Sequence, residues 1–278
     1  TSKAPREGVL RVAADAEPQS LDPQLTTGHT EHRILTSLFE GLTTLNQKTL
    51  AVEPGVAKTW EVSEDGKTYT FHVNPEAKWS DGAPVTAHDF VYSYRRILSP
   101  KLASEYSYMP WCIENAEAFN KETIQDFTQV GVKAIDDATL EVKLAYPAPY
   151  FLSMQIHNSW FPVQQATIEK FGKIDDRQSD WILAGNMVSN GPFKLAEWRP
   201  NEIIRVVLCS GKVYYDLYDA REAQGLDNVY ILRVEQLYPF PAQDLQDQID
   251  RYPATADIAW VQEEPRNMGP WRLVSECT

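Results

Sequence analysis

The side chains best suited to chemistry include five histidines, two of which lie close together in sequence. His29 and His32 are three residues apart, so on a helix they would be neighbours on one face. Imidazole is a common zinc ligand, but a zinc site needs three or four ligands. No third ligand is spaced to complete such a site, and we therefore expect no metal.

Two other short motifs could take part in catalysis. Cys209-Ser210-Gly211 could present a nucleophile after a strand, but a strand that ends at a glycine turn is the favoured explanation. Glu263-Glu264 follows another predicted strand, where α/β sheets place ligand sites, although a solvated charge pair is commoner. The sequence has no nucleophile elbow, Walker loop or dinucleotide-binding glycine motif. We therefore expect no catalytic residues, no cofactor and no enzymatic activity.

The composition indicates a folded, acidic chain. Its 278 residues include 26 basic and 39 acidic side chains, a formal charge of −13, and 43% are hydrophobic. This charge argues against nucleic acid as a partner, because phosphate binding requires a basic surface. No apolar run approaches the roughly 20 residues that span a bilayer, so we expect no membrane insertion. The polar start, Thr1–Gly8, could be what remains after removal of a signal peptide.

The three cysteines give no clear signal about the compartment. Cys112, Cys209 and Cys277 have no short metal-like spacing, and an odd number cannot pair completely. At least Cys209 is expected to be a small buried apolar side chain.

The stretch Ala77–Tyr94 predicts the end of a strand, a tight turn and a capped helix. Asp81-Gly82 is a turn pair, because glycine readily reaches positive φ. Thr86 can cap the helix through its hydroxyl, and the charge of Asp89 suits the positive helix end.

Hairpins and short helices account for most of the first 204 residues, which predicts mixed α/β structure. The predicted elements are a strand at 9–13, a helix that carries Ile34, Leu35, Leu38 and Phe39 and ends at Gly41, hairpins formed by 61–63 with 67–73 and by 132–135 with 139–144, helices near 147–155 and 168–171, and a strand at 193–198.

The pattern changes near Ile204, where we place a domain boundary. Residues 206–211 and 229–234 read as strands buried on both faces, and 258–261 as a third strand. Helices are predicted at 213–224, stopped by Gly225, and at 242–252. This β-α-β-α-β order predicts a small parallel sheet with right-handed crossovers.

Residues 9–205 resemble the periplasmic oligopeptide-binding proteins, the extracytoplasmic solute-binding family 5 of peptide ABC transporters. The resemblance is carried by the following ordered segments: Ser20-Leu21-Asp22-Pro23, Leu38-Phe39-Glu40-Gly41-Leu42, Pro54-Gly55-Val56-Ala57, the stretch 77–93, the segment 131–142, and Ser189-Asn190-Gly191-Pro192-Phe193-Lys194-Leu195. It implies a periplasmic protein whose two lobes close on an oligopeptide and deliver it to a membrane permease complex. It also implies a small lobe at about 44–165, inserted in a partial first lobe within residues 1–204.

The resemblance also implies which residues reach the peptide. Thr27, Gly28 and His29 resemble the loop that lines its first residues, Tyr106 and His157 fall at the cleft, and Asn190-Gly191 resembles the loop beside the crossover strands. Core packing or a local turn is the alternative for each. The family's distal lobe would follow residue 205 and has no counterpart in this sequence, so we expect impaired binding.

Residues 205–278 resemble instead the C-terminal domain of the thiamine-diphosphate-dependent 2-oxoglutarate dehydrogenase, which has a transketolase-like fold. The resemblance is carried by the segments 205–217, 233–241 and 260–271. It implies a cytoplasmic parent, a role in dimer assembly, and an alternative reading as a non-catalytic enzyme fragment. Our interpretation is a hybrid chain: a truncated periplasmic-binding-protein-like part followed by a transketolase-C-terminal-like segment.

Overall fold

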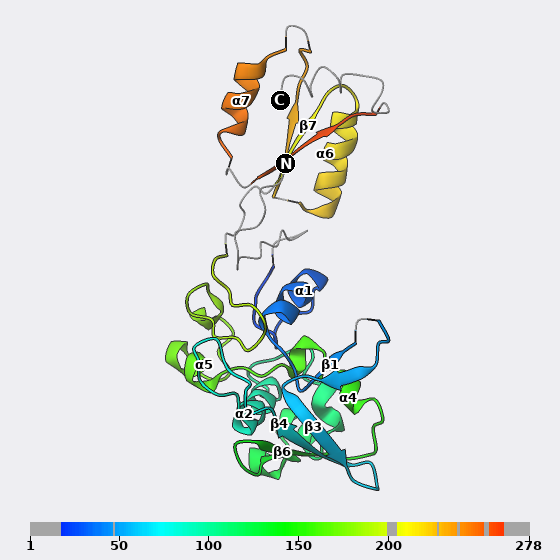
Figure 1. Cartoon of the computed structure of the whole chain (residues 1–278), viewed down its shortest axis with the longest axis vertical. Coiled ribbons are helices and arrows are strands. Elements are labelled where there is room, and N and C mark those ends of the chain that lie inside the picture. The colour runs from blue at the N-terminus through cyan, green and yellow to red at the C-terminus, as the bar shows by residue number, and fades with distance from the viewer. Residues whose placement is uncertain are drawn as a thin grey trace. The chain divides into compact units, whose positions relative to one another are not determined.

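A computed structural model of the chain describes residues 18–46, 48–198, 205–226, 228–237, 240–252 and 256–263. The described residues fall into two compact units (Figure 1). One unit is Pro18–Trp198, and the other contains the described residues from 205 onward. The predicted strand at 9–13 and the predicted boundary near Ile204 lie outside the described residues. The predicted small lobe at about 44–165 stays a prediction.

The Pro18–Trp198 unit mixes helices with antiparallel sheets, as the sequence predicts. Strands β1 and β2 form a two-stranded sheet, and a four-stranded sheet has the order β3-β4-β6-β5. The α-helices are α1 (His29–Leu38), α2 (Ala87–Ile97), α3 (Ala116–Asn120), α4 (Phe151–Met154) and α5 (Gln165–Phe171). The 3-10 helices are η1 (Met109–Cys112), η2 (Phe127–Gln129), η3 (Asn158–Trp160) and η4 (Asp180–Ile182). The strands are β1 (Thr43–Leu45), β2 (Val52–Pro54), β3 (Ala57–Val62), β4 (Thr68–Val73), β5 (Val132–Ala134) and β6 (Thr139–Lys143).

Both predicted hairpins are confirmed, as β3 paired with β4 and β5 paired with β6. In the β3–β4 hairpin Trp60 pairs with Phe71, and Gly66 in the turn has a φ of 69°. Glycine tolerates this left-handed conformation because it has no Cβ. Alternate residues of β4 are buried, which places Phe71 against the core.

The predicted cap of α2 is present in detail. The Thr86 N–H donates to Asp89 Oδ2 at 2.8 Å, and the two side chains also meet at 3.0 Å. Together with the bond from the third helical residue back to Thr86, this makes a capping box. Gly82, in the preceding turn, has the expected positive φ, at 93°.

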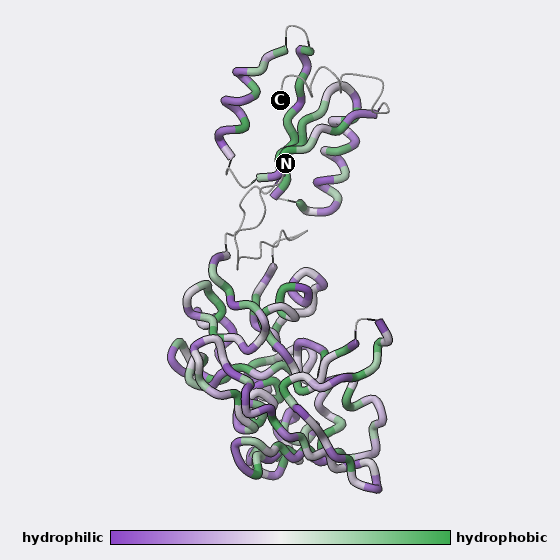
Figure 2. Tube along the Cα trace, in the orientation of Figure 1, coloured by the Kyte–Doolittle hydropathy of each residue, from purple (hydrophilic) through white to green (hydrophobic). Residues whose placement is uncertain are grey.

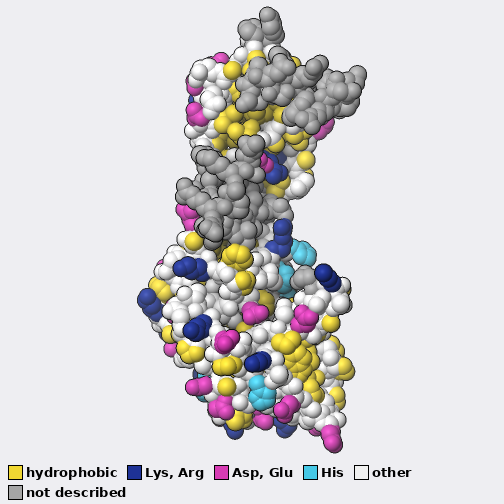
Figure 3. Space-filling model, in the orientation of Figure 1, with side chains coloured by type: hydrophobic (Ala, Val, Ile, Leu, Met, Phe, Trp, Pro, Cys, Tyr) yellow, Lys and Arg dark blue, Asp and Glu magenta, His cyan; other side chains and the backbone are white. Residues whose placement is uncertain are grey.

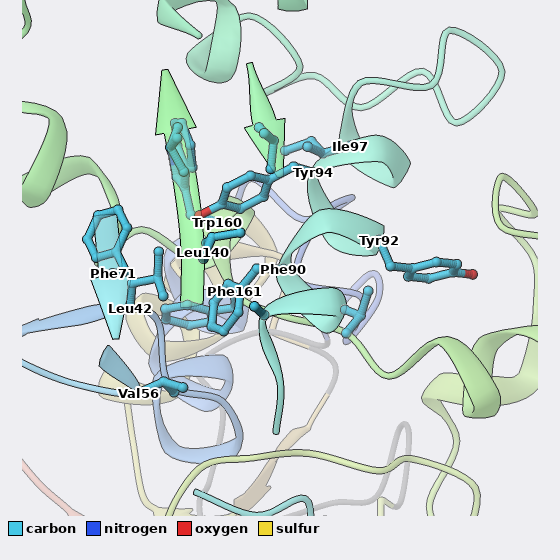
Figure 4. Close-up of a cluster of buried hydrophobic side chains, with 14 of the residues drawn as sticks. Leu42, Val56, Phe71, Phe90, Tyr92, Tyr94, Ile97, Leu140, Trp160 and Phe161 are labelled. Carbon is cyan, nitrogen blue, oxygen red and sulfur yellow. The ribbon is translucent and has the colours of Figure 1, made fainter. Parts of the chain in front are cut away.

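Helix α2 contacts β5 and β6, and its apolar face forms the centre of the core. In Figure 4, Phe90 and Tyr94 point from α2 toward Leu140 and Trp160, whereas Tyr92 points away. The rings of Tyr94 and Trp160 meet edge-on with centroids 5.3 Å apart. This dense packing gives the unit a rigid scaffold on which loops can be held in place.

Two predicted details of this unit are wrong. Helix α1 ends at Leu38 because Phe39 is extended, so Gly41 does not stop it. A Cβ on Gly41 would instead collide with the backbone oxygen of Gln155, which explains the glycine by close packing. Residues 193–198 form no strand, because Phe193 makes a single backbone bond to Ser37 rather than a ladder.

The second unit has the predicted parallel β-α-β-α-β layout. Its three-stranded sheet has the order β8-β7-β9, with both pairings parallel. The elements are β7 (Arg205–Cys209), α6 (Val213–Gln224), β8 (Val229–Arg233), α7 (Ala242–Ile249) and β9 (Asp257–Val261). Gly225 ends α6 in the left-handed conformation, with a φ of 63°. Figure 2 shows hydrophobic residues along β7 and hydrophilic residues recurring along α7.

Only the central strand of this sheet is buried as predicted. Four of the five residues of β7 are buried, including Cys209, whose thiol is free. The predicted burial of 229–234 on both faces is wrong for β8, which is mostly half-buried. Among the described residues β8 and β9 each pair with one neighbour, β7, and therefore lie at the edges of the sheet.

Candidate functional site

The first predicted site segment forms the start of α1. Thr27 and His29 are exposed, and Gly28 is the N-cap residue. A Cβ on Gly28 would collide with the carboxylate of Glu31, which folds back and accepts the Gln19 N–H at 3.0 Å. A Cβ here would meet only the end of the flexible Glu31 side chain, so this contact alone does not demand glycine, and residues 27–29 are exposed.

Asn158, which the sequence did not single out, joins this loop to the rest of the site. Its Nδ2 donates to the Pro23 carbonyl at 2.6 Å and lies 3.3 Å from Thr26 Oγ1. A carbonyl can only accept, so this contact fixes the orientation of the amide. Asn158 Oδ1 then faces His32 Nδ1 at 3.0 Å, and that nitrogen must carry the proton.

His157 is held in the opposite tautomer by the residue two positions later. Its Nδ1 accepts the Ser159 N–H at 3.3 Å and lies 2.9 Å from the Ser159 hydroxyl. When the ring is neutral, its proton is therefore on Nε2. Burial, and secondly the nearby His32, lower the pKa of His157. His157 is thus neutral at pH 7.

Four rings from three parts of the chain form a row in which each ring lies next to the following one. The centroids of His32 and His157 are 5.8 Å apart, with their planes inclined by 28°. Tyr106 meets His157 edge-on at 4.7 Å, and Tyr108 lies 6.3 Å from Tyr106. We call His32, Tyr106, Tyr108 and His157 the ring group. Its aromatic spacings are those of favourable ring pairs.

Asn190 and Gly191 lie at the other end of α1. The Glu40 N–H donates to Asn190 Oδ1 at 3.1 Å, and Asn190 Nδ2 donates to the Glu40 carbonyl at 2.9 Å. The Gly191 N–H donates to the Leu38 carbonyl at 2.8 Å. His32 and Leu38 are six residues apart on α1, a rise of about 9 Å, so this pair is separate from the ring group. The structure shows these residues anchoring the helix end, and their role at a ligand stays a prediction.

The structure therefore brings together Tyr106 and His157 and adds His32 and Tyr108. His32 was considered only as a partner of His29 in a metal site. Its position one turn after the predicted loop is a signal that could have placed it here. Asn158 adjoins His157 in sequence, but its bonds to Pro23 and His32 span more than 120 residues, which no local pattern reveals.

Among the described residues, none of the other candidate catalytic or metal-binding side chains forms a site. Burial raises the pKa of the Cys209 thiol, which disfavours the nucleophilic thiolate. Glu264 and Cys277 lie outside the described residues. Within the described ranges, no three His, Cys, Asp or Glu side chains gather as a metal site would require, and no helix is long and apolar enough to cross a membrane. On the face shown in Figure 3, acidic and basic side chains are interspersed over the Pro18–Trp198 unit.

Comparison with known proteins points to one family. The profile of the bacterial extracellular solute-binding proteins, family 5 Middle, matches residues 51–236. The periplasmic oligopeptide-binding protein OppA of Escherichia coli K12 is 44% identical over 202 residues, 72% of this chain and 35% of that protein. The dipeptide-binding protein DppE of Bacillus subtilis 168 is 39% identical over 204 residues, 73% of this chain and 36% of that protein. The chain spans about a third of the length of these relatives.

Solved structures show the same likeness. Haemophilus influenzae OppA in complex with RPPGFSPFR has a TM-score of 0.62 and 40% identity, covering 68% of this chain and 36% of that one. The unliganded open form of the periplasmic murein tripeptide-binding protein MppA has a TM-score of 0.62 and 31% identity, covering 86% of this chain and 47% of that one.

Proposed function

The chain belongs to the bacterial extracellular solute-binding proteins of family 5, and we propose that it binds oligopeptides for uptake by an ABC transporter. By the same reasoning it works in the periplasm and hands its ligand to a membrane permease complex. It has no catalytic role in this proposal, because the function is to bind and release a solute unchanged.

One observation carries the proposal: the exposed loop of residues 27–29 lies beside the ring group. Asn158 bonds to Pro23 just before this loop and to His32 just after it. A peptide laid along an exposed backbone gains main-chain hydrogen bonds whatever its side chains are. An accessible loop beside a fixed set of rings therefore suits a ligand with a constant backbone and variable side chains.

We expect the affinity to be modest. Each main-chain hydrogen bond replaces a bond to water and contributes only about 0.5–1.5 kcal/mol net. Association also costs translational and rotational freedom. A dissociation constant weaker than about 1 µM is the expected outcome for the chain alone.

The test is calorimetric titration of the chain with Ala-Ala-Ala, with free alanine as the matched control. We expect saturable heat from the tripeptide and none from alanine, which lacks a peptide bond. Identical heats for the two, or no saturation with either, would overturn the proposal.

A second proposal concerns residues 205–278, which we infer to derive from a 2-oxoglutarate dehydrogenase C-terminal domain. Its support is the parallel β8-β7-β9 sheet, whose layout differs from the antiparallel sheets of the Pro18–Trp198 unit. Against it, the family 5 match continues to residue 236, well beyond the predicted boundary. Peptide mapping by mass spectrometry tests the junction, because a hybrid chain must yield fragments that cross residues 199–212. Turnover of 2-oxoglutarate with added thiamine diphosphate and magnesium would contradict the non-catalytic assignment.

A further inference from the structure

We propose that the ring group is a subsite for an aromatic side chain of the bound peptide. The inference rests on the proposed function, which it deepens by naming the side-chain chemistry that this part of the site selects. The argument has three parts: the spacing of the rings, the way they are fixed, and the charge around them.

The rings form a continuous series rather than isolated contacts. Successive centroids from His32 through His157 and Tyr106 to Tyr108 are 5.8, 4.7 and 6.3 Å apart. Tyr108, at the end of the series, is 56% exposed. An exposed ring at the end of a packed series can be extended by one more ring, supplied by a ligand, at the same spacing.

The two histidine rings are fixed through the same atom, Nδ1. His32 Nδ1 donates to the buried Asn158, and His157 Nδ1 accepts from Ser159. The rings therefore cannot turn freely, and little entropy is lost when a ligand packs against them. Ser159 also reaches Met109 Sδ at 3.5 Å, which ties His157 to the segment that follows Tyr108.

The charge around the ring group disfavours an acidic ligand side chain. His157 is neutral at pH 7, because burial and His32 lower its pKa. Glu31, in the first turn of α1, is buried against Gly28. A ligand carboxylate brought to His157 would meet a neutral imidazole and gain no ion pair there. An uncharged planar side chain needs no such partner.

The test compares Ala-Phe-Ala with Ala-Ala-Ala, Ala-Glu-Ala and the tripeptide that carries cyclohexylalanine in place of Phe. Phe is also placed at the first and third positions. Binding to the full chain is followed by calorimetry and by the NMR signals of the His32 and His157 rings. A ring contact is worth about 0.5–1.5 kcal/mol, so one Phe peptide should bind about two- to tenfold tighter than its cyclohexyl analogue.

Variants separate the ring contact from general effects on the protein. Tyr108→Ala should abolish the preference for Phe, and Tyr108→Phe should restore it. Tyr150→Ala is the matched control, because Tyr150 is also exposed, at 52%, and lies outside the ring group. It should leave the preference unchanged.

The remaining outcomes distinguish this inference from the proposed function. If all the tripeptides bind equally, or Ala-Glu-Ala binds tightest, the aromatic subsite is overturned and peptide binding stands. N-acetylphenylalanine amide probes the rings without a longer peptide. If it shifts the histidine signals while no tripeptide binds, the subsite stands and peptide binding is overturned. If nothing binds, both are overturned.

Discussion

Asp22 and Arg96 form a buried, two-bond ion pair inside the Pro18–Trp198 unit. Arg96 Nη2 lies 2.6 Å from Asp22 Oδ2, and Nη1 lies 3.0 Å from Oδ1. The guanidinium also donates to Gln24 Oε1 at 2.9 Å and to the Ile174 carbonyl at 2.8 Å. The pair thus fixes the loop on both sides of Pro23, whose carbonyl accepts from Asn158. The loop that leads into α1 is therefore fixed by the buried Arg96 as well as by Asn158, which also bonds to the ring group.

Asp22→Asn should strongly destabilise the protein. It removes the negative charge and leaves the fully buried Arg96 charge uncompensated, which costs about 3–5 kcal/mol in unfolding free energy. Urea denaturation measures the loss. The matched control is Glu117→Gln, which breaks the exposed pair of Glu117 with Lys121 and should cost less than about 0.5 kcal/mol. Equal costs for the two variants would contradict the structural role assigned to Asp22.

Gly191→Ala should destabilise the anchored end of α1. A Cβ at this position would lie 2.6 Å from Leu38 C and 2.7 Å from Phe39 N, and backbone atoms cannot give way. Overpacking of this kind costs about 1–3 kcal/mol. At Gly172 the nearest atom is the end of the Asp176 side chain, at 2.6 Å, which can move. Gly172→Ala should therefore cost less, and thermal unfolding of both variants checks the order.

The two histidines of the ring group should be opposite tautomers. His32 should carry its proton on Nδ1, because it donates to Asn158, and neutral His157 on Nε2, because its Nδ1 accepts from Ser159. Long-range proton–nitrogen NMR spectra at alkaline pH distinguish the two forms. Asn158→Ala should remove the preference of His32 for the Nδ1-protonated tautomer and leave the tautomer of His157 unchanged. The same tautomer at both rings would show that the contacts around Asn158 are wrong.

Acidification should weaken the fold through His157. Its folded-state pKa lies below the ordinary value of 6.5, so the unfolded chain takes up the proton first as the pH falls. The stability contribution is complete above pH 6.5 and is lost as the pH falls from there through the folded pKa. Burial raises the pKa of Glu40 and of Asp89 above 4.5 and 3.8, so these groups act in the opposite direction.

His157→Asn isolates this contribution. The asparagine oxygen can still accept the Ser159 N–H, but the side chain does not titrate. As the pH falls from about 7.5 to about 5.5, the wild type should therefore lose more unfolding free energy than the variant does. A difference that stays constant across this range would exclude His157 as the titrating group.

Local chemistry explains which parts of the fold could be predicted. Thr86 and Asp89 have the spacing of a helix cap, and the structure shows a capping box there. Gly66, Gly82 and Gly225 lie at the positive φ angles that their turns require. The strand predicted at 193–198 failed because Lys194, Ala196 and Glu197 have low strand propensity and Phe193 bonds instead to Ser37.

The candidate site was less accessible to sequence reasoning. Tyr106 and His157 were named only through a family resemblance, since an aromatic residue and a lone histidine are ordinary core residues. The contact of His157 with His32 depends on Asn158 and on packing between segments more than 100 residues apart, and Tyr106 meets His157 from 51 residues away. Long-range contacts of this kind follow from the whole fold and leave no local pattern in the sequence.

The most direct test of the central claim is an amide NMR titration of the chain with Ala-Ala-Ala. Peptide binding at the start of α1 predicts saturable shifts that are largest for Thr27, Gly28 and His29 and that extend to His157. The amide of Gly172, the C-cap residue of α5, serves as an internal reference and should not shift. Shifts that fail to saturate, or that centre away from residues 27–29 and His157, would contradict the account.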